Sequence, residues 1–166
     1  YGHPTGDAVL KEMSDMLGVE VVGVDNPEEA AKGVDIIVTA TTAREPVYKG
    51  EWMDKGTHIN AIGSNHWMRR EIDDTAIKRS SIIVADDLED SKIEAGELIG
   101  AVERGNLTWG QVHELGDVVV GRVPGRTSDD DITLFKSNGI AMEDVAVAAR
   151  LYQKAKQKKL GQEIPI

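Results

Sequence analysis

The chain contains no cysteine, and among its 166 residues basic side chains are scarce relative to acidic ones. Without cysteine it can form no disulfide, no thiolate nucleophile and no cysteine-ligated zinc centre. Lys and Arg number 19 against 29 Asp and Glu, which gives a formal net charge of −10. Such a field repels nucleic acids and anionic membranes, so we expect neither as a partner.

Long apolar runs are also missing, and no stretch approaches the roughly 20 apolar residues that are needed to span a bilayer. Residues 1–9 lack a signal-peptide pattern, so we expect a cytoplasmic protein. The four histidines show no metal-ligand spacing, and no metal site is predicted. The chain begins with Tyr1 rather than Met, which we interpret as a segment cut from a longer protein.

The composition is that of one globular domain, with 40% hydrophobic and 29% charged residues. Helical and strand patterns alternate along it with short connections, which predicts an α/β fold built on a parallel sheet. The predicted strands are Val19–Val24, Val34–Ala40, Thr57–Gly63, Ser81–Asp86 and Ile132–Phe135. The predicted helices are Pro4–Leu17, Pro27–Gly33, Glu71–Lys78, Ile93–Val102 and Ala141–Lys158, while residues 113–120 fit either pattern.

The two strands within residues 34–65 carry the strongest functional signal. Each has a short, β-branched apolar body, which is typical of a buried strand. Their small or polar ends are Thr39, Thr41 and Thr42 for the first strand, and Asn60, Gly63, Ser64 and Asn65 for the second. Ligands of open α/β sheets bind outside the carboxyl ends of the strands. We therefore predict that the strands ending at Thr41 and Ile62 are adjacent and parallel, with both tips at a nucleotide site. The alternative is that Thr and Asn only end strands and open turns.

The glycine-rich turn that usually holds a dinucleotide pyrophosphate is missing. The chain has neither a G-x-G-x-x-G fingerprint nor a Walker lysine. The backbone amides of such a turn supply charge-assisted hydrogen bonds to the phosphates at a helix N-terminus. We therefore expect these residues alone to bind NAD(P) weakly or not at all.

Several segments together resemble the ornithine cyclodeaminase/μ-crystallin family of NAD(P)-dependent proteins. They are VDIIVTATTAREPV, INAIGSN followed by RREID, EAGEL, and PGRTSDDDITLFKSNGIAMEDVAVA, and they follow in order through almost the whole chain. The resemblance implies a Rossmann-like, doubly wound parallel sheet that lacks its first strand and glycine-rich turn. It also implies hydride transfer between a nicotinamide and the α-carbon of an amino acid or its imine, as in alanine dehydrogenases, ketimine reductases and cyclodeaminases.

On this resemblance, residues 1–150 form a partial dinucleotide-binding domain. Residues 151–166 are then the end of the last helix and a tail that returns towards an N-terminal domain preceding Tyr1. The groups that hold the substrate carboxylate would lie in that earlier part, so we expect the segment alone to be inactive and the full-length protein to be a homodimer. In the segment, Leu160, Ile164 and Ile166 are expected to be exposed, disordered or captured by another copy.

The resemblance further implies roles for individual residues. The matched cofactor contacts are Thr41, Asn60, Ala61, Ile62, Arg69 and Ser137, and Asn138 matches a residue that lines the substrate. Small strand ends let a flat ring approach the backbone, and Ser and Asn can form hydrogen bonds with its carboxamide.

Two departures from the family pattern affect the predicted chemistry. Asn65 stands where ornithine-cyclising members carry a proton-accepting aspartate; because Asn cannot accept a proton, a dehydrogenase, an imine reductase or another cyclodeaminase subtype is favoured. The acidic residue that would bind the NAD 2′-hydroxyl is absent near Gly2, and Gly2, His3 and Thr5 leave room for the 2′-phosphate of NADP. The predicted function is an NAD(P)-dependent oxidoreductase or cyclodeaminase acting on an amino acid or cyclic imine. The alternative is a non-catalytic, cofactor-binding protein of the crystallin type.

Overall fold

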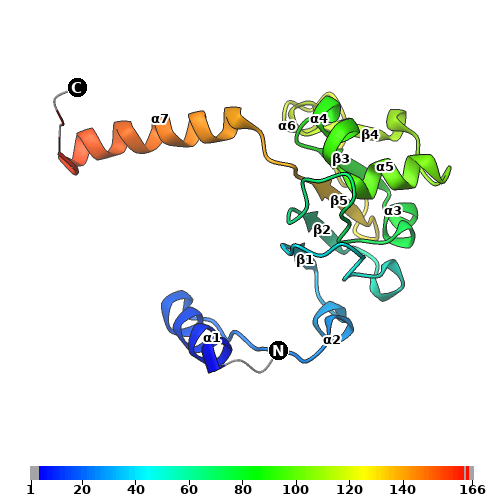
Figure 1. The fold of residues 1–166 in the computed structure, drawn as a ribbon, viewed down its shortest axis with the longest axis horizontal. Helices are drawn as coiled ribbons and strands as arrows, with labels where there is room; N and C mark the ends of the chain where they lie inside the picture. Colours follow the sequence, from blue (N-terminus) through cyan, green and yellow to red (C-terminus); the bar gives the residue numbers. More distant parts are fainter. Residues whose placement is uncertain (1–3, 163, 165–166) are drawn as a thin grey trace.

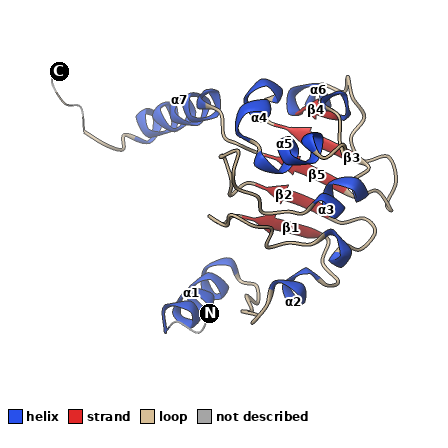
Figure 2. Cartoon of the chain, turned by 45° about the vertical axis from the view of Figure 1, so that its right-hand side comes forward, coloured by secondary structure: helices blue, strands red, loops and turns tan. Residues whose placement is uncertain are grey.

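A computed structural model describes residues 4–162 and 164 and contains one five-stranded, all-parallel sheet. The strand order is β1-β2-β5-β3-β4, so the last strand in the sequence lies at the centre of the sheet (Figure 2). The strands are β1 Ile36–Thr39, β2 His58–Ala61, β3 Ile82–Ala85, β4 Val112–Glu114 and β5 Thr133–Lys136. The predicted α/β class with a parallel, Rossmann-like sheet is confirmed.

Seven α-helices precede, connect and follow the strands in the described residues, and three of them begin at a residue whose side chain caps the first turn. The helices are α1 Pro4–Leu17, α2 Pro27–Ala31, α3 Asp74–Arg79, α4 Leu88–Glu94, α5 Gly96–Glu103, α6 Leu115–Val119 and α7 Ala141–Lys158. The side chains of Asn26, Asp73 and Asp87 cap α2, α3 and α4 by accepting hydrogen bonds from backbone N–H groups of the first turn. Two short 3-10 helices, Gly50–Trp52 and Trp109–Gln111, complete the list.

The core lies between one face of the sheet and the helices α3 and α5, which cover that face (Figure 1). Ile59 of β2 and Leu134 of β5 point into this layer and are 0% and 1% exposed. They belong to the same buried cluster as Ile77 of α3 and Leu98 of α5. This packing fixes the central strands and therefore the position of their carboxyl ends.

The opposite face of the sheet is more open, which corrects the prediction of a fully buried first strand. Ile36 and Val38 of β1 are 63% and 56% exposed, whereas Ile37 between them is buried. The reason is that the core covers only one face of β1, so that alternate residues along the strand point to the open face. An open groove on this face is bordered by His58, Asn60 and other residues of β1, β2, β3 and β5.

Three sequence assignments differ from the structure. The predicted helix Ile93–Val102 is interrupted at Ala95, which ends α4 and precedes α5. Val19–Val24 was predicted to be a strand but forms none, and Val19 and Val22 are 58% and 67% exposed. A strand requires a hydrogen-bonded neighbour, and no described residue pairs with this segment. Residues 113–120 fitted two patterns because they contain both, the end of β4 followed directly by α6.

The first and last helices stand apart from the sheet (Figure 1). All residues of α7 are exposed except Ala155, which is half-buried. Beyond it, Leu160 and Ile164 are 64% and 76% exposed, as predicted, while Ile166 lies outside the described residues. Within the part of the chain that the structure describes, no helix is long and apolar enough to cross a bilayer.

Candidate functional site

The carboxyl ends of four neighbouring strands meet at one edge of the sheet, which we call the rim (residues 39–41, 61–65, 85–86 and 136–139). β1 and β2 are adjacent and parallel, with Thr39 opposite Ala61 in the register. The Ile62 N–H donates to the Thr39 carbonyl at 2.9 Å, which continues the pairing past the strand ends. The predicted adjacency of these two tips is confirmed.

The tip of β5 lies beside that of β2, and the tip of β3 lies beyond it. The Ser137 N–H donates to the Ala61 carbonyl at 3.1 Å, and the Asp86 N–H donates to the Lys136 carbonyl at 3.2 Å. Ser137 and Asn138 lie far from Thr41 and Ile62 in the sequence, but the strand order brings all four residues to the rim. The sequence patterns did not predict this strand order.

Glu71 holds the tips of β1 and β2 together from below. Its side chain is 0% exposed and accepts hydrogen bonds from the Thr39 hydroxyl at 2.9 Å, the Thr41 N–H at 2.5 Å and the Gly63 N–H at 2.8 Å. Three donors satisfy this buried carboxylate without a direct ion pair. The backbone on both sides of the predicted nucleotide position is thereby fixed.

Gly63 allows the close approach that this arrangement requires. A Cβ atom on Gly63 would overlap the Thr41 backbone, with the Thr41 carbonyl oxygen 2.6 Å away, and would also overlap the Glu71 carboxylate. Only glycine fits here, and the requirement comes from space rather than from a positive φ angle.

Asp86 organises the tip of β5 in a similar way. Its Oδ2 accepts from the Ser137 hydroxyl at 2.9 Å, the Asn138 N–H at 2.8 Å and the Gly139 N–H at 2.7 Å. The Asn138 amide donates to the Ser91 hydroxyl at 2.9 Å, while its Oδ1 is buried and has no hydrogen-bond partner.

Lys136 lies directly below the rim, although it ends an otherwise apolar strand. Its ammonium group is 0% exposed and donates to the carbonyls of Ala61, Ser64 and Ser137. The Glu97 carboxylate, also 0% exposed, lies 3.8 Å from the Lys136 Nζ. Burial lowers the pKa of Lys136 and raises the pKa of Glu97, and the charge of each partner opposes the effect of burial on the other.

The matched cofactor residues take different positions around this rim. Thr41 and Ile62 are exposed on it, whereas Ala61 is 0% exposed and contributes only backbone. The Asn60 amide lies on the open sheet face, with its Oδ1 3.3 Å from His58 Nε2. The structure therefore brings Thr41, Ile62, Ser137 and Asn138 to one edge and directs the Asn60 side chain elsewhere.

Asn65 and Arg69 lie in the segment that follows β2. Asn65 is exposed and Arg69 is half-buried. The backbone N–H of Arg69 donates to the His66 carbonyl at 2.9 Å. Among the described residues Arg69 forms no ion pair.

Sequence reasoning missed the four buried charged residues that build the rim: Glu71, Asp86, Glu97 and Lys136. The available signal was that Lys136 ends a buried strand and Asp86 follows one directly. A charge at such a position is rare unless it is paired. The small and polar residues at the strand ends, Thr41 and Ser137, fit the close approach of a flat nicotinamide ring.

Comparison with known proteins gives one consistent result. Residues 4–159 match the model of the ornithine cyclodeaminase/mu-crystallin family. The chain is 44% identical over 139 residues to an alanine dehydrogenase from Archaeoglobus fulgidus, which covers 83% of the chain and 42% of that protein. The chain therefore spans less than half the length of this relative.

Solved structures agree with this match. A Δ(1)-pyrroline-2-carboxylate reductase from Thermococcus litoralis, in complex with NADH and L-proline, superposes with a TM-score of 0.91 at 38% identity and covers 98% of this chain and 51% of its own. An archaeal alanine dehydrogenase dimer with bound NAD gives a TM-score of 0.81 at 40% identity and covers 93% of this chain and 48% of its own. The fold of this chain is thus that of about half of each of these two proteins.

Proposed function

The chain belongs to the ornithine cyclodeaminase/mu-crystallin family, and on that premise we propose that the complete protein is a nicotinamide-dependent oxidoreductase that acts on an amino acid or its imine. When bound, the nicotinamide accepts hydride from, or delivers it to, the substrate α-carbon. The observation that carries the proposal is the rim, where Thr41, Ile62, Ser137 and Asn138 share one edge of the sheet.

Ser137 and Arg69 are the proposed contacts for the nicotinamide carboxamide. The Ser137 hydroxyl donates its single hydrogen to Asp86. Its oxygen therefore keeps lone pairs that can accept a hydrogen bond from an amide NH₂. Arg69 can donate to the carboxamide oxygen, since its guanidinium carries only donors. Asn138, which matches a substrate-lining residue of the family, is the proposed substrate contact.

Asn65 favours reduction of an imine, or the reverse oxidation of an amino acid, over cyclising deamination. An amide has no proton-accepting lone pair of useful basicity, so Asn65 cannot serve as the base that a cyclodeaminase of the ornithine type needs. The similar alanine dehydrogenase and Δ(1)-pyrroline-2-carboxylate reductase support the same choice.

The preference between NAD and NADP follows from residues at the beginning of the chain. Their sequence favours NADP, but Gly2 and His3 lie outside the described residues. The Thermococcus litoralis relative, in contrast, was solved with NADH. Parallel titrations with NADH and NADPH decide the preference, and tighter NADH binding contradicts the sequence-based choice.

In this proposal residues 1–150 form part of a dinucleotide-binding domain, and residues 151–166 lead back to a preceding domain. That earlier part supplies the pyrophosphate-binding turn, the substrate carboxylate contacts and the dimer interface. The exposed α7 and Leu160 are consistent with such a partner surface. The chain covers about half of each solved relative, which further supports the division.

The proposal is tested by assaying NADH oxidation by the complete protein with pyruvate plus ammonia and with a cyclic α-imino acid. Ser137→Ala is expected to raise KM for NADH by roughly 10-fold, which corresponds to one lost hydrogen bond of about 1.4 kcal/mol. The matched control is Ser81→Ala, an exposed serine that immediately precedes β3, at the end of the strand opposite the rim. Failure of the complete protein to bind any nicotinamide dinucleotide overturns the proposal.

A further inference from the structure

Three charged side chains lie beneath the rim with 0% exposure: Glu71, Glu97 and Lys136. Burying an ion costs several kcal/mol, and apolar residues of similar volume often replace a buried ion pair without loss of stability. Stability alone therefore does not account for this cluster. Its location, directly below the residues proposed to contact the nicotinamide, suggests another role.

The hydrogen bonds of Lys136 are restricted to two strand tips. An ammonium group has three donors, and Lys136 directs them to the carbonyls of Ala61 at 3.4 Å, Ser137 at 3.0 Å and Ser64. Ala61 and Ser64 belong to the tip of β2, and Ser137 belongs to the tip of β5. The ammonium group thus holds together two adjacent tips of the rim at which the ring is proposed to bind.

Glu97 links this ammonium group to the carboxylate that organises the other side of the rim. Its Oε1 accepts the Glu71 N–H at 2.9 Å, and its Oε2 lies 3.8 Å from Lys136 Nζ without a hydrogen-bond partner. Glu71 in turn gathers N–H groups of the β1 and β2 tips. The two kinds of buried charge therefore bind different backbone groups. The Lys136 ammonium group donates to carbonyls, and the Glu71 carboxylate accepts from N–H groups.

We infer that Lys136, with Glu97 as its counter-ion, is a positioning residue that sets the spacing between the β2 tip and Ser137 and so shapes the site for the nicotinamide ring. The inference rests on the proposed function, because it presumes that a nicotinamide binds at the rim. Lys136 does not contact the ring, since it is buried beneath the backbone that it holds.

The test uses the complete protein and separates positioning from stability. Lys136→Met alone leaves Glu97 buried without a counter-ion and is expected to lower stability. The double variant Lys136→Met/Glu97→Gln removes both charges and is expected to recover most of that loss, but it cannot hold the carbonyls. Binding is then measured for NADH and for ADP-ribose, which has the same adenosine and diphosphate but no nicotinamide.

We expect the double variant to weaken NADH binding by roughly 10-fold and ADP-ribose binding by less than about 2-fold, because the disturbed backbone faces only the ring. Ile77→Ala, a buried change on α3 away from the rim, is the control for general destabilisation and should leave the ratio of the two affinities unchanged. An unchanged NADH affinity, or an equal loss for both ligands, overturns the inference. A wild-type protein that binds neither ligand instead overturns the proposed function.

Glu97→Gln alone provides an independent readout if the double variant does not fold. It keeps the ammonium group but removes its nearest counter-ion, and only Glu71 and Asp86 then remain as acidic groups facing Lys136. The pKa of Lys136 should fall further below its usual value, so NADH affinity should decline at a lower pH than in the wild type. Identical pH profiles for the two proteins contradict the inference.

Discussion

Gly63 shows at the scale of a single residue how closely the strand tips approach. Replacing it with alanine would push a Cβ atom into the Thr41 backbone and the Glu71 carboxylate. We expect Gly63→Ala to lower the free energy of unfolding by about 1–3 kcal/mol, as overpacking of a tight site does. Gly116→Ala is the matched control, since Gly116 lies in α6 with open space around it and the change should be neutral or stabilising. Equal effects in urea denaturation would contradict the close approach.

The Glu71 carboxylate offers a second residue-scale test. Gln has the same shape but presents an NH₂ group to one of the three donors that Glu71 accepts. Glu71→Gln is therefore expected to cost about 2–3 kcal/mol of stability, the range for hydrogen bonds to a charged group. Glu94→Gln, on the exposed surface of α4, should change stability by less than about 0.5 kcal/mol. A small effect at Glu71, measured by the same denaturation curves, would show that the tips are held in another way.

The sequence allowed prediction of which residues end the strands, but not of the charges beneath them. Thr41 and Ile62 follow apolar runs, so their place on a common edge could be inferred from local pattern alone. The partners of Glu71 and Lys136, in contrast, lie 32 residues away at Thr39 and 72 residues away at Ser64. Local patterns carry no information about such pairs, because these contacts exist only after the strand order is set.

At the scale of elements, α3 and α5 are joined by the ion pair of Asp74 with Arg104. The Arg104 Nε and Nη2 donate to the Asp74 carboxylate at 2.6 and 2.5 Å, and this pairing holds the pKa of Asp74 below its usual value. The stabilisation is therefore present above the unfolded pKa of about 3.9 and is lost as the pH falls through the lower folded value.

Asp74→Asn should accordingly cost only about 0.5–1 kcal/mol at pH 7, because the pair is partly exposed and screened by solvent. Thermal unfolding measured as a function of pH checks the sign. The difference between variant and wild type should shrink below about pH 4, where the carboxyl group becomes protonated. A difference that grows as the pH falls contradicts the assignment.

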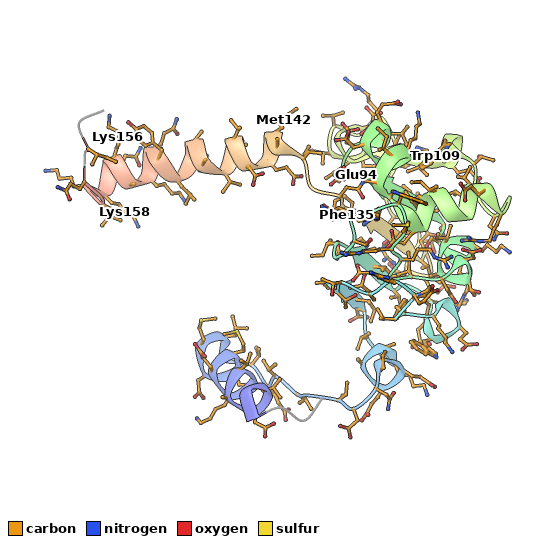
Figure 3. All side chains as sticks on the ribbon, viewed as in Figure 1. Glu94, Trp109, Phe135, Met142, Lys156 and Lys158 are labelled. Carbon is orange, nitrogen blue, oxygen red and sulfur yellow. The ribbon has the colours of Figure 1, made fainter. Side chains whose placement is uncertain are left out.

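The helix α7 is expected to be less stable than the sheet, because it buries none of its 18 residues. Its side chains extend freely along its length, as the labelled Met142, Lys156 and Lys158 show (Figure 3). A helix of this length is marginal in water without tertiary packing. In hydrogen exchange of the 166-residue chain, we expect α7 amides to exchange nearly as fast as an unfolded peptide, whereas β2 and β5 are protected by about a thousand-fold or more. Strong protection of α7 would show that it already has its packing partner.

Element boundaries followed the strength of the local signals. Residues 141–158 were predicted as α7 without error, since acidic residues at the start and lysines at the end mark both limits. Val19–Val24 has the same β-branched composition as the true strands but forms no ladder. A β-branched composition is therefore not sufficient for a strand, because the segment also needs a neighbouring strand with which to form backbone hydrogen bonds.

At the scale of the whole molecule, the missing glycine turn separates this chain from a complete cofactor-binding protein. The proposed contacts for the nicotinamide ring lie at the rim, but the described residues include no glycine-rich turn for the pyrophosphate. Isothermal titration calorimetry of the 166-residue chain should therefore detect no NADH binding, or binding weaker than about 1 mM. Micromolar binding would require another phosphate site, with Arg69 and Arg126 the first residues to test.

The proposed function requires the complete protein to transfer hydride to a substrate α-carbon at this rim. The most direct measurement is to supply NADH carrying deuterium at both C4 positions together with a cyclic α-imino acid, and to locate the label in the product by NMR. We predict deuterium at the α-carbon of the resulting amino acid, with a rate reduced roughly 10-fold by Ser137→Ala. Saturating NADH binding with no deuterium in any imine-derived product would contradict the claim and identify a cofactor-binding protein without turnover.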